Sequence, residues 1–178
     1  LGHNVMVWNG VPILKSVGLF GPNASGKSNV MKAINFCCRM ILDSHLYNEG
    51  TVFNFEPFKF DGWQDKSSKF LIDFVCDNIE YEYSFELTKE RILSESLYHY
   101  PVGRRAKVFV REANGKYSFG TGVFAKPLDV VLNTSEKNLF LSRARSMNRE
   151  LAQKLYRHFM NQFLLGLVNV NEVMVLDS

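Results

Sequence analysis

The chain has 178 residues and a net charge of +3, with 46% hydrophobic and 22% charged residues, a composition that is ordinary for a globular protein and excludes collagen, coiled coils and disordered chains. This length provides enough buried surface for one core and too little for two large ones, so we expect one domain. The longest apolar run near the C-terminus, residues 163–168, is far shorter than the roughly 20 residues that cross a bilayer, so we expect no membrane partner.

The cysteines indicate a reducing compartment. Cys37 and Cys38 are adjacent and Cys76 is isolated, and the odd number of three with no CxxC pair argues against a disulfide framework or a zinc site. No signal peptide is visible at the N-terminus. We therefore predict a cytoplasmic protein with reduced, buried cysteines. Because residue 1 is a leucine, we expect the true start of the protein to lie upstream.

The first fifty residues predict a strand, a glycine-rich loop and a helix in direct succession. Residues 11–20 are apolar and are followed by a glycine, which is typical of a buried parallel strand that leads into a loop. After the loop, apolar residues recur every three or four positions from about Lys27 to about Leu42. This spacing predicts an amphipathic helix.

The middle of the chain changes to the two-residue period of strands. Strands are predicted at residues 70–74, 79–87, 91–98 and 107–111. Asp77-Asn78 provides a turn between the first two, and Asn114-Gly115 is a strong hairpin signal. We therefore predict an antiparallel meander over most of residues 53–119.

Helical periodicity returns after the meander. An apolar stripe over residues 151–167 predicts a helix, with Asn148 at the cap position and Glu150 in the first turn, where a carboxylate interacts favourably with the helix dipole. A shorter helix is predicted from about Ser135 to Arg145. The expected fold class is therefore α/β, with a β-rich middle and helices after it.

One motif in the predicted loop carries chemistry. Residues 21–28, GPNASGKS, fit the Walker A pattern GxxxxGK[ST] at every specified position. The glycines allow the compact curve that points backbone N–H groups inward at a helix N-terminus, which makes a cradle for an anion. The sequence therefore predicts a nucleoside triphosphate site, in preference to a structural glycine loop with an ordinary surface lysine.

The polar residues of this loop have separate expected roles. Lys27 supplies a flexible charge to the β- and γ-phosphates and is the catalytic candidate, and the Ser28 hydroxyl enters the shell of a bridging Mg²⁺. The residues expected to hold the nucleotide are Gly21, Pro22, Asn23, Ala24, Ser25, Gly26, Lys27, Ser28 and Asn29.

The sequence resembles a known family over most of its length. The segment GPNASGKSN, followed by an apolar helix, resembles the Walker A segment of the ABC-type ATPases that include the SMC and RecF proteins. Together with five looser segments, it is similar to the AAA-family ATP-binding proteins related to the OLD-type and abortive-infection ATPases of bacteria and archaea. The five segments are residues 11–15, 57–61, 74–83, 91–97 and 138–142.

This resemblance implies the N-terminal lobe of an ABC-type P-loop NTPase, with an antiparallel β-rich subdomain, C-terminal helices and the cofactors ATP and Mg²⁺. Residues 1–50 would form the P-loop core, 51–132 the β-rich subdomain and 133–178 the helical segment, all within the N-terminal part of one ATPase domain. The resemblance also implies that ATP lies between two copies in a head-to-tail homodimer of the full-length protein.

The second half of such a domain supplies a signature loop, a Walker B aspartate and a catalytic glutamate. Leu141-Ser142 begins like the signature LSGGQ, but side chains replace both glycines, so a helix with an arginine face is favoured. Residues 173–177 fit Walker B superficially, with Asp177 at the metal, but Ser178 follows instead of an acid. We expect a fragment that binds nucleotide and stops before its catalytic half, so that hydrolysis belongs to the full-length ATPase.

Basic residues gather in two windows, 103–111 and 141–157, which together carry +8 while the rest of the chain sums to −5. This segregation fits a nucleic-acid footprint or a solvated face. The leading hypothesis is an ATP-driven dimer that gates an effector, such as nucleic-acid processing in phage defence. The alternatives are a DNA-organising or repair ATPase of the SMC or RecF kind, a nucleotide-binding module without hydrolysis, and a small-molecule kinase, which the β meander disfavours.

Overall fold

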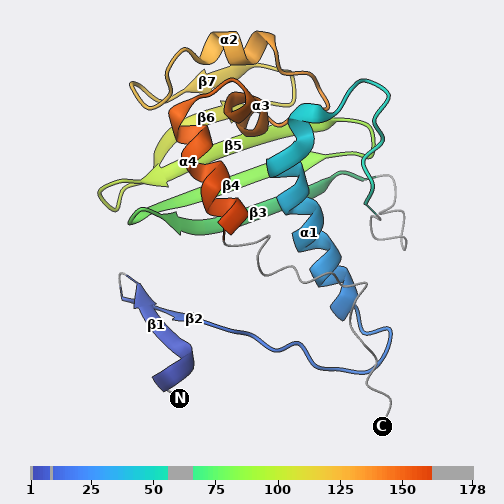
Figure 1. Ribbon diagram of the computed structural model, residues 1–178, viewed down its shortest axis with the longest axis vertical. Coiled ribbons are helices and arrows are strands. Elements are labelled where there is room, and N and C mark those ends of the chain that lie inside the picture. The colour runs from blue at the N-terminus through green and yellow to red at the C-terminus, as the bar shows by residue number, and fades with distance from the viewer. Residues whose placement is uncertain (1, 9, 56–65, 162–178) are drawn as a thin grey trace. The chain divides into compact units, whose positions relative to one another are not determined.

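The computed structural model describes residues 2–8, 10–55 and 66–161. The chain divides into two compact units, residues 1–33 and 34–178. Helix α1 (Lys27–Asp43) begins in the first unit and ends in the second. Figure 1 shows the elements of each unit.

The first unit contains a small hairpin and the glycine-rich loop. A short 3-10 helix, η1 (Gly2–Asn4), leads into strand β1 (Val5–Trp8). This strand pairs antiparallel with β2 (Val11–Leu14), from Val5 opposite Leu14 to Trp8 opposite Val11. Asn4 fastens the open end of the hairpin, because its amide group donates to the Ser16 carbonyl (2.8 Å) and accepts from the Ser16 N–H (2.9 Å).

The prediction of a buried parallel strand over residues 11–20 is wrong. The strand ends at Leu14, its partner runs antiparallel, and Leu14 and Phe20 are 57% and 95% exposed. The connection between β1 and β2 is too short for the crossover that parallel pairing requires. The apolar run therefore contains only the short strand β2 of a two-stranded sheet, and its residues 12–20 are exposed in the structure.

The second unit is built on a five-stranded antiparallel sheet. Its strands are β3 (Ser68–Cys76), β4 (Ile79–Leu87), β5 (Ile92–Tyr100), β6 (Ala106–Arg111) and β7 (Tyr117–Phe119), and each pairs with the next in chain order. The predicted meander is confirmed over residues 68–119, whereas the described residues 53–55 and 66–67 form no strand.

The predicted turns connect these strands. Asp77 and Asn78 join β3 to β4 with φ angles of 49° and 60°, and left-handed conformations at both central residues match the right-handed twist of the hairpin. Gly115 lies between β6 and β7 with φ 80°, and its N–H donates to the Glu112 carbonyl (2.9 Å). Turn chemistry that the sequence displays thus fixes both hairpins.

Helices cover one face of the sheet, as Figure 1 shows for the second half of α1, from Ile34 onward, and for α3 and α4. The elements after α1 are η2 (Ser44–Leu46), α2 (Pro127–Leu132), α3 (Phe140–Ser146) and α4 (Glu150–Phe159). The second half of α1 and α4 both pack on β3, where the ring centroids of Phe36 and Phe70 lie 5.5 Å apart and those of Phe159 and Phe74 4.8 Å apart. Beneath these helices, alternate residues of β4, Tyr81, Tyr83, Phe85 and Leu87, are fully buried.

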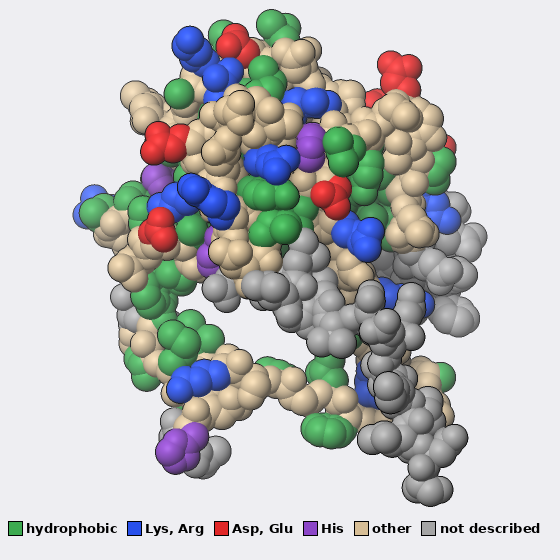
Figure 2. All heavy atoms as spheres, in the orientation of Figure 1, with side chains coloured by type: hydrophobic (Ala, Val, Ile, Leu, Met, Phe, Trp, Pro, Cys, Tyr) green, Lys and Arg blue, Asp and Glu red, His purple; other side chains and the backbone are tan. Residues whose placement is uncertain are grey.

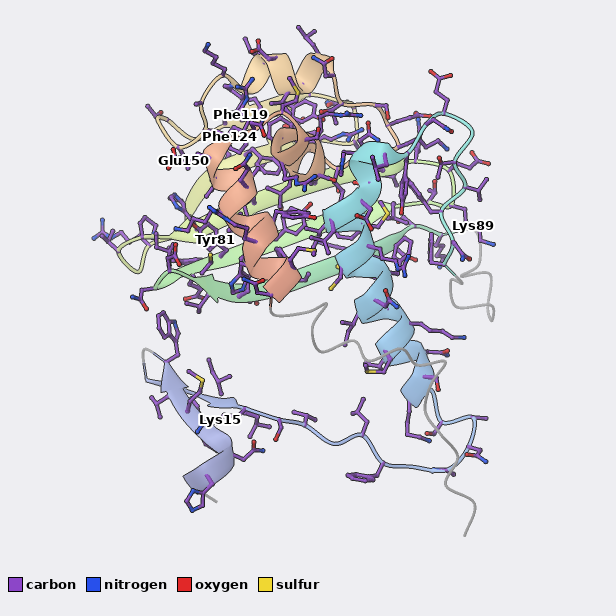
Figure 3. The ribbon with its side chains drawn as sticks, in the orientation of Figure 1. Lys15, Tyr81, Lys89, Phe119, Phe124 and Glu150 are labelled. Atoms are coloured by element: carbon purple, nitrogen blue, oxygen red, sulfur yellow. The ribbon has the colours of Figure 1, made fainter. Side chains whose placement is uncertain are left out.

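Helix α3 is anchored by aromatic packing at its first residue. The Phe140 ring lies 5.5 Å from Phe119 and 5.3 Å from Phe124, and Figure 3 labels the latter two beside α3. The predicted helix from Ser135 to Arg145 therefore begins five residues late. Ser135 donates its hydroxyl to the Asn138 side chain (3.0 Å), and side-chain bonds of this kind compete with helical backbone bonds.

Two predictions for α1 and α4 are tested by the structure. The helix predicted from about Lys27 to about Leu42 is confirmed at Lys27–Asp43. The N-cap of α4 is Arg149, not Asn148, because Asn148 has φ 57° and its side-chain oxygen accepts from Gln153 (2.8 Å) instead of from the helix backbone. Residues 162–167 of the predicted stripe lie outside the described residues.

Taken together, the described elements form a mixed α/β structure whose strand pairings are all antiparallel. The ABC-type lobe arrangement and the boundaries at residues 50 and 132 remain predictions. No helix in residues 2–8, 10–55 or 66–161 is long and apolar enough to span a membrane.

Candidate nucleotide-binding site

The Walker A residues form a loop that leads directly into α1. The Ser25 N–H donates to the Pro22 carbonyl (3.3 Å), which closes a turn, and the N–H groups of Asn29 and Val30 both donate to the Gly26 carbonyl (3.0 and 3.3 Å). The loop therefore ends where the helix begins, at Lys27. The first N–H groups of an α-helix have no partner within the helix, so this end of α1 offers free donors and the positive end of the helix dipole.

The Lys27 ammonium group folds back over the loop. Its Nζ donates to the carbonyl oxygens of Gly21 (2.7 Å) and Pro22 (2.6 Å) and to the Ser25 hydroxyl (3.1 Å). These acceptors are neutral, so the positive charge of Lys27 is not cancelled by an ion pair there. The flexible stem of lysine allows the same group to turn toward an anion at the loop.

The two glycines of the motif are required for different reasons. Gly26 has φ 89°, and although a Cβ there would meet nothing within 4 Å, a side chain would be strained in this backbone conformation. A Cβ on Gly21 would lie 3.1 Å from the Ser25 hydroxyl, so a side chain there would require that hydroxyl to shift. The backbone path of the loop therefore favours glycine at Gly26 through its φ angle and at Gly21 through the space available.

The charge of the first unit favours an anion. Residues 1–33 contain three lysines, Lys15, Lys27 and Lys32, and neither aspartate nor glutamate. Figure 3 labels Lys15 beside the hairpin of this unit. Because no carboxylate of this unit offsets the lysines or the helix dipole, its local potential is positive.

The remaining predicted site residues are accessible to a ligand. Pro22, Asn23, Ala24, Ser28 and Asn29 are exposed, while Gly26 and Lys27 are half-buried. No group of three or more His, Cys, Asp or Glu that could hold a metal occurs in the part of the chain that the structure describes. A single hydroxyl from Ser28 suits Mg²⁺, which usually keeps several waters and binds phosphate oxygens with few protein ligands.

The alternative motifs have different outcomes. Ser142 is buried, its hydroxyl lies 3.0 Å from His45 Nδ1, and it belongs to α3, so the favoured interpretation of residues 141–145 as a helix is confirmed. The arginine face of this helix is present at Arg143 and Arg145. Asp177 lies outside the described residues, and its proposed role at the metal stays a prediction.

A buried polar cluster joins β5, β6, η2 and the start of α3, and sequence reasoning missed it. Its members, all buried, are Ser44, Glu95, Arg111, Asn138 and Ser142. Arg111 Nη1 donates to the Asn138 carbonyl (2.9 Å), and Asn138 Nδ2 donates to the Ser44 carbonyl (2.6 Å). These partners are far apart in sequence, so no local pattern predicts the cluster as a whole. The local signal that could have pointed to it is Glu95, a glutamate at an inward-facing position of β5. The cluster holds the second unit together and lies outside the Walker A loop.

Comparison with known proteins identifies the family. Residues 16–165 match the family described as "AAA domain, putative AbiEii toxin, Type IV TA system". No curated protein and no solved structure matches the chain significantly. AAA domains in general bind ATP with Mg²⁺ and act as ATPases, and the matched range includes the whole Walker A loop. Because the match covers most of the 178 residues, the chain belongs to this AAA-domain family.

Proposed function

We propose that the Walker A loop of this chain binds ATP with Mg²⁺, and that in the full-length protein ATP binding and hydrolysis drive a homodimerisation that gates an effector. The observation that carries the first part is the position of the Lys27 ammonium group, which is bonded only to neutral acceptors at the N-terminus of α1. The family's description, which names a type IV toxin–antitoxin system, supports an effector role in defence such as nucleic-acid processing.

The residues of the loop would divide the work of binding. Lys27 exchanges its carbonyl acceptors for the β- and γ-phosphate oxygens, and its charge is compact enough to follow both. The exposed Ser28 hydroxyl ligates Mg²⁺, which neutralises phosphate charge when bound. The free N–H groups at the start of α1 donate to the phosphates, and Gly21 keeps the backbone close to them.

Binding and hydrolysis make different demands on this chain. Hydrolysis requires a group that orients or activates water, and the first unit has no Asp or Glu to supply one. The carboxylate would come from another part of the protein, with Asp177 as one proposal, or from a second copy in a head-to-tail dimer. A nucleotide-binding module without hydrolysis is therefore the second candidate function, and the same absence of carboxylates favours it.

The test compares two lysines of the same helix. We expect Lys27→Ala to weaken MgATP binding by at least about tenfold, which is about 1.4 kcal/mol, in isothermal titration calorimetry. Lys32→Ala removes the same charge from an exposed position five residues further along α1 and should change affinity by less than about twofold. Equal affinity of the Lys27→Ala variant and the wild-type chain would overturn the proposal.

A second variant separates the metal role from the phosphate role. Ser28→Ala should weaken ATP binding when Mg²⁺ is present and leave it unchanged in excess EDTA, because only the metal contact is lost. A phosphate-release assay on the same samples then distinguishes the two candidate functions. Release that disappears in Lys27→Ala supports an ATPase, and tight binding without release supports the binding module.

A further inference from the structure

A polar pocket of about 360 Å³ lies where α3 ends and α4 begins, within the second unit. Its lining residues are Arg145, Ser146, Asn148, Gln153, Tyr156 and Arg157. Two guanidinium groups, two amides and two hydroxyls make up this lining, and no carboxylate takes part. In Figure 2, Lys and Arg side chains lie over the region of α3 and α4 on the viewed face.

The two pocket arginines differ from their basic neighbours because neither forms an ion pair within the described residues. Arg149 pairs with Asp129 (3.2 Å), and Lys154 pairs with Asp77 (2.9 Å). The Arg157 side chain is exposed and forms no hydrogen bond or ion pair within the described ranges. Arg145 likewise has no acidic partner there. Asp77 is the acid nearest in effect to Arg157, since chiefly Lys154 and more weakly Arg157 lower its pKa, but its ion pair is with Lys154. The pocket thus holds two arginines that form no ion pair in the described residues.

Arg145 is held in place by an aromatic ring. Its Cζ lies 3.9 Å from the centre of the Tyr156 ring, a stacking distance for a guanidinium group. Stacking fixes the plane of the guanidinium and leaves its N–H groups free at the edge, where they can bind an oxyanion with two bonds. It also occupies one face of Tyr156, so recognition here rests on charge and hydrogen bonds more than on stacking of a base.

The polar neighbours of the arginines have donors to spare. Gln153 Nε2 donates to Asn148 Oδ1 (2.8 Å), which leaves the Asn148 amide N–H groups without a partner in residues 66–161. Asn148 lies in the link between Ser146, the last residue of α3, and Glu150, the first residue of α4. Its backbone there is left-handed, with φ 57°. Burial lowers the pKa of His45, and the positive charges of Arg145 and Arg143 lower it further. The influence of these arginines therefore extends beyond the pocket.

In the other basic window, residues 103–111, most of the basic side chains have polar or acidic partners. Arg105 forms an ion pair with Glu82 (2.5 Å), Lys107 donates to the Ser118 hydroxyl (3.0 Å), and Arg111 is buried against the Asn138 carbonyl. Only Arg104 of this window has no such contact in the described residues. The window 103–111 therefore keeps one arginine without such a contact, whereas the corner between α3 and α4 gathers two in one pocket.

We infer that this pocket is a second anion site, distinct in sequence from the Walker A loop, that binds a phosphate group of a nucleic-acid strand or of a small phosphorylated ligand through Arg145 and Arg157. Its volume lies within the range of small-ligand sites and exceeds what a single phosphate needs. The guanidinium and amide N–H donors of the lining are groups that commonly contact phosphate oxygens.

The test uses two probes and a matched control. The probes are a short fluorescein-labelled single-stranded DNA, followed by fluorescence anisotropy, and inorganic phosphate, followed by calorimetry. Both are measured on the whole chain in a Lys27→Ala background, so that the Walker A loop does not contribute. The pocket variants are Arg157→Gln and Arg145→Gln, and the control Arg104→Gln removes the same charge from the other basic window.

A nucleic-acid ligand gives a defined result. Arg157→Gln and Arg145→Gln should each weaken oligonucleotide binding at least about fivefold, and the slope of log affinity against log salt should fall by about 0.7 for each lost contact, whereas Arg104→Gln changes neither. A small phosphorylated ligand is indicated instead if the pocket variants lose phosphate binding and the oligonucleotide does not bind the pocket. Arg157 is exposed and unpaired in the described ranges, so its variant should melt as the Lys27→Ala parent does. If neither probe distinguishes the pocket variants from Arg104→Gln, the inference is overturned.

Discussion

The Glu95 carboxyl group on β5 accepts hydrogen bonds from the backbone N–H groups of Phe140 (2.5 Å) and Leu141 (3.0 Å), and so caps α3 from a distant strand. It also accepts a hydrogen bond from the Tyr83 hydroxyl (2.8 Å), and its residue is only 1% exposed. The Glu95 side chain thereby takes the place of a local capping side chain, since Leu139 at the N-cap forms no side-chain hydrogen bond.

Removal of this carboxyl group should destabilise the second unit. Glu95→Ala leaves two helix N–H groups and the Tyr83 hydroxyl buried without an acceptor, so we expect a loss of about 2–4 kcal/mol in the free energy of unfolding measured with urea. Glu95→Gln retains one oxygen acceptor and should cost less. A smaller loss for Ala than for Gln would show that these hydrogen bonds do not matter.

The same residue should give the fold a pH dependence. Burial raises the pKa of Glu95, although the hydrogen bonds from Leu141 and Phe140 and the charge of Arg111 oppose the shift. A carboxyl group whose pKa is higher in the folded state holds its proton longer there, so stability falls as pH rises from the unfolded pKa of about 4.3 through the raised value. The difference in unfolding free energy between the wild-type chain and Glu95→Gln should therefore shrink from about pH 4 to about pH 7. A difference that stays constant over this range contradicts the shift.

Asn138 should be equally sensitive, because it connects three segments. Its Nδ2 donates to the carbonyls of Ser44 (2.6 Å) and Tyr47 (3.0 Å), and its Oδ1 accepts from Arg143 (2.8 Å). Asn138→Ala should cost about 2–4 kcal/mol by urea unfolding, since buried partners lose their bonds together. Asn35→Ala is the matched control on α1 and should stay within about 0.5 kcal/mol, because the half-buried Asn35 oxygen accepts from Arg39 (3.1 Å) within the same helix.

The β3–β4 turn provides a test of backbone strain. Asn78 has φ 60°, a conformation that asparagine tolerates and a β-branched residue does not. Asn78→Val should lower the free energy of unfolding by about 1–2 kcal/mol, and Asn78→Gly should leave it unchanged within about 0.5 kcal/mol. Thermal denaturation of both variants distinguishes this effect from a loss of side-chain contacts, because glycine removes the side chain completely.

The cysteines should be unreactive until the chain unfolds. Cys37, Cys38 and Cys76 are all buried, and burial raises the pKa of Cys38 to about 11. At pH about 8 only about one thousandth of the Cys38 side chains would then be thiolate, which is the reactive form. Titration with DTNB should detect almost no thiol in the native protein and all three in guanidinium chloride. Rapid reaction of the native protein would show that these side chains are accessible.

Features set by neighbouring residues were determined by the sequence alone. The alternation over residues 79–87 identified which face of β4 is buried, Asp77-Asn78 identified the first hairpin, and the spacing after Lys27 identified α1 to within one residue. Walker A is equally local, because a loop and the first turn of the following helix supply all of its groups. Each of these depends on steric and periodic properties that act within a few residues.

Features that depend on distant partners were decided only by the tertiary structure. Arg104 and Arg105 are adjacent and alike in sequence, yet Arg105 is neutralised by Glu82, 23 residues away, and Arg104 is not. The apolar run at 11–20 resembles a buried strand, but burial requires a neighbouring sheet that no local pattern specifies. Charge compensation and burial are long-range properties of packing, which is why the sequence located the Walker A loop but could not distinguish the free arginines at the α3–α4 corner from those that packing had already neutralised.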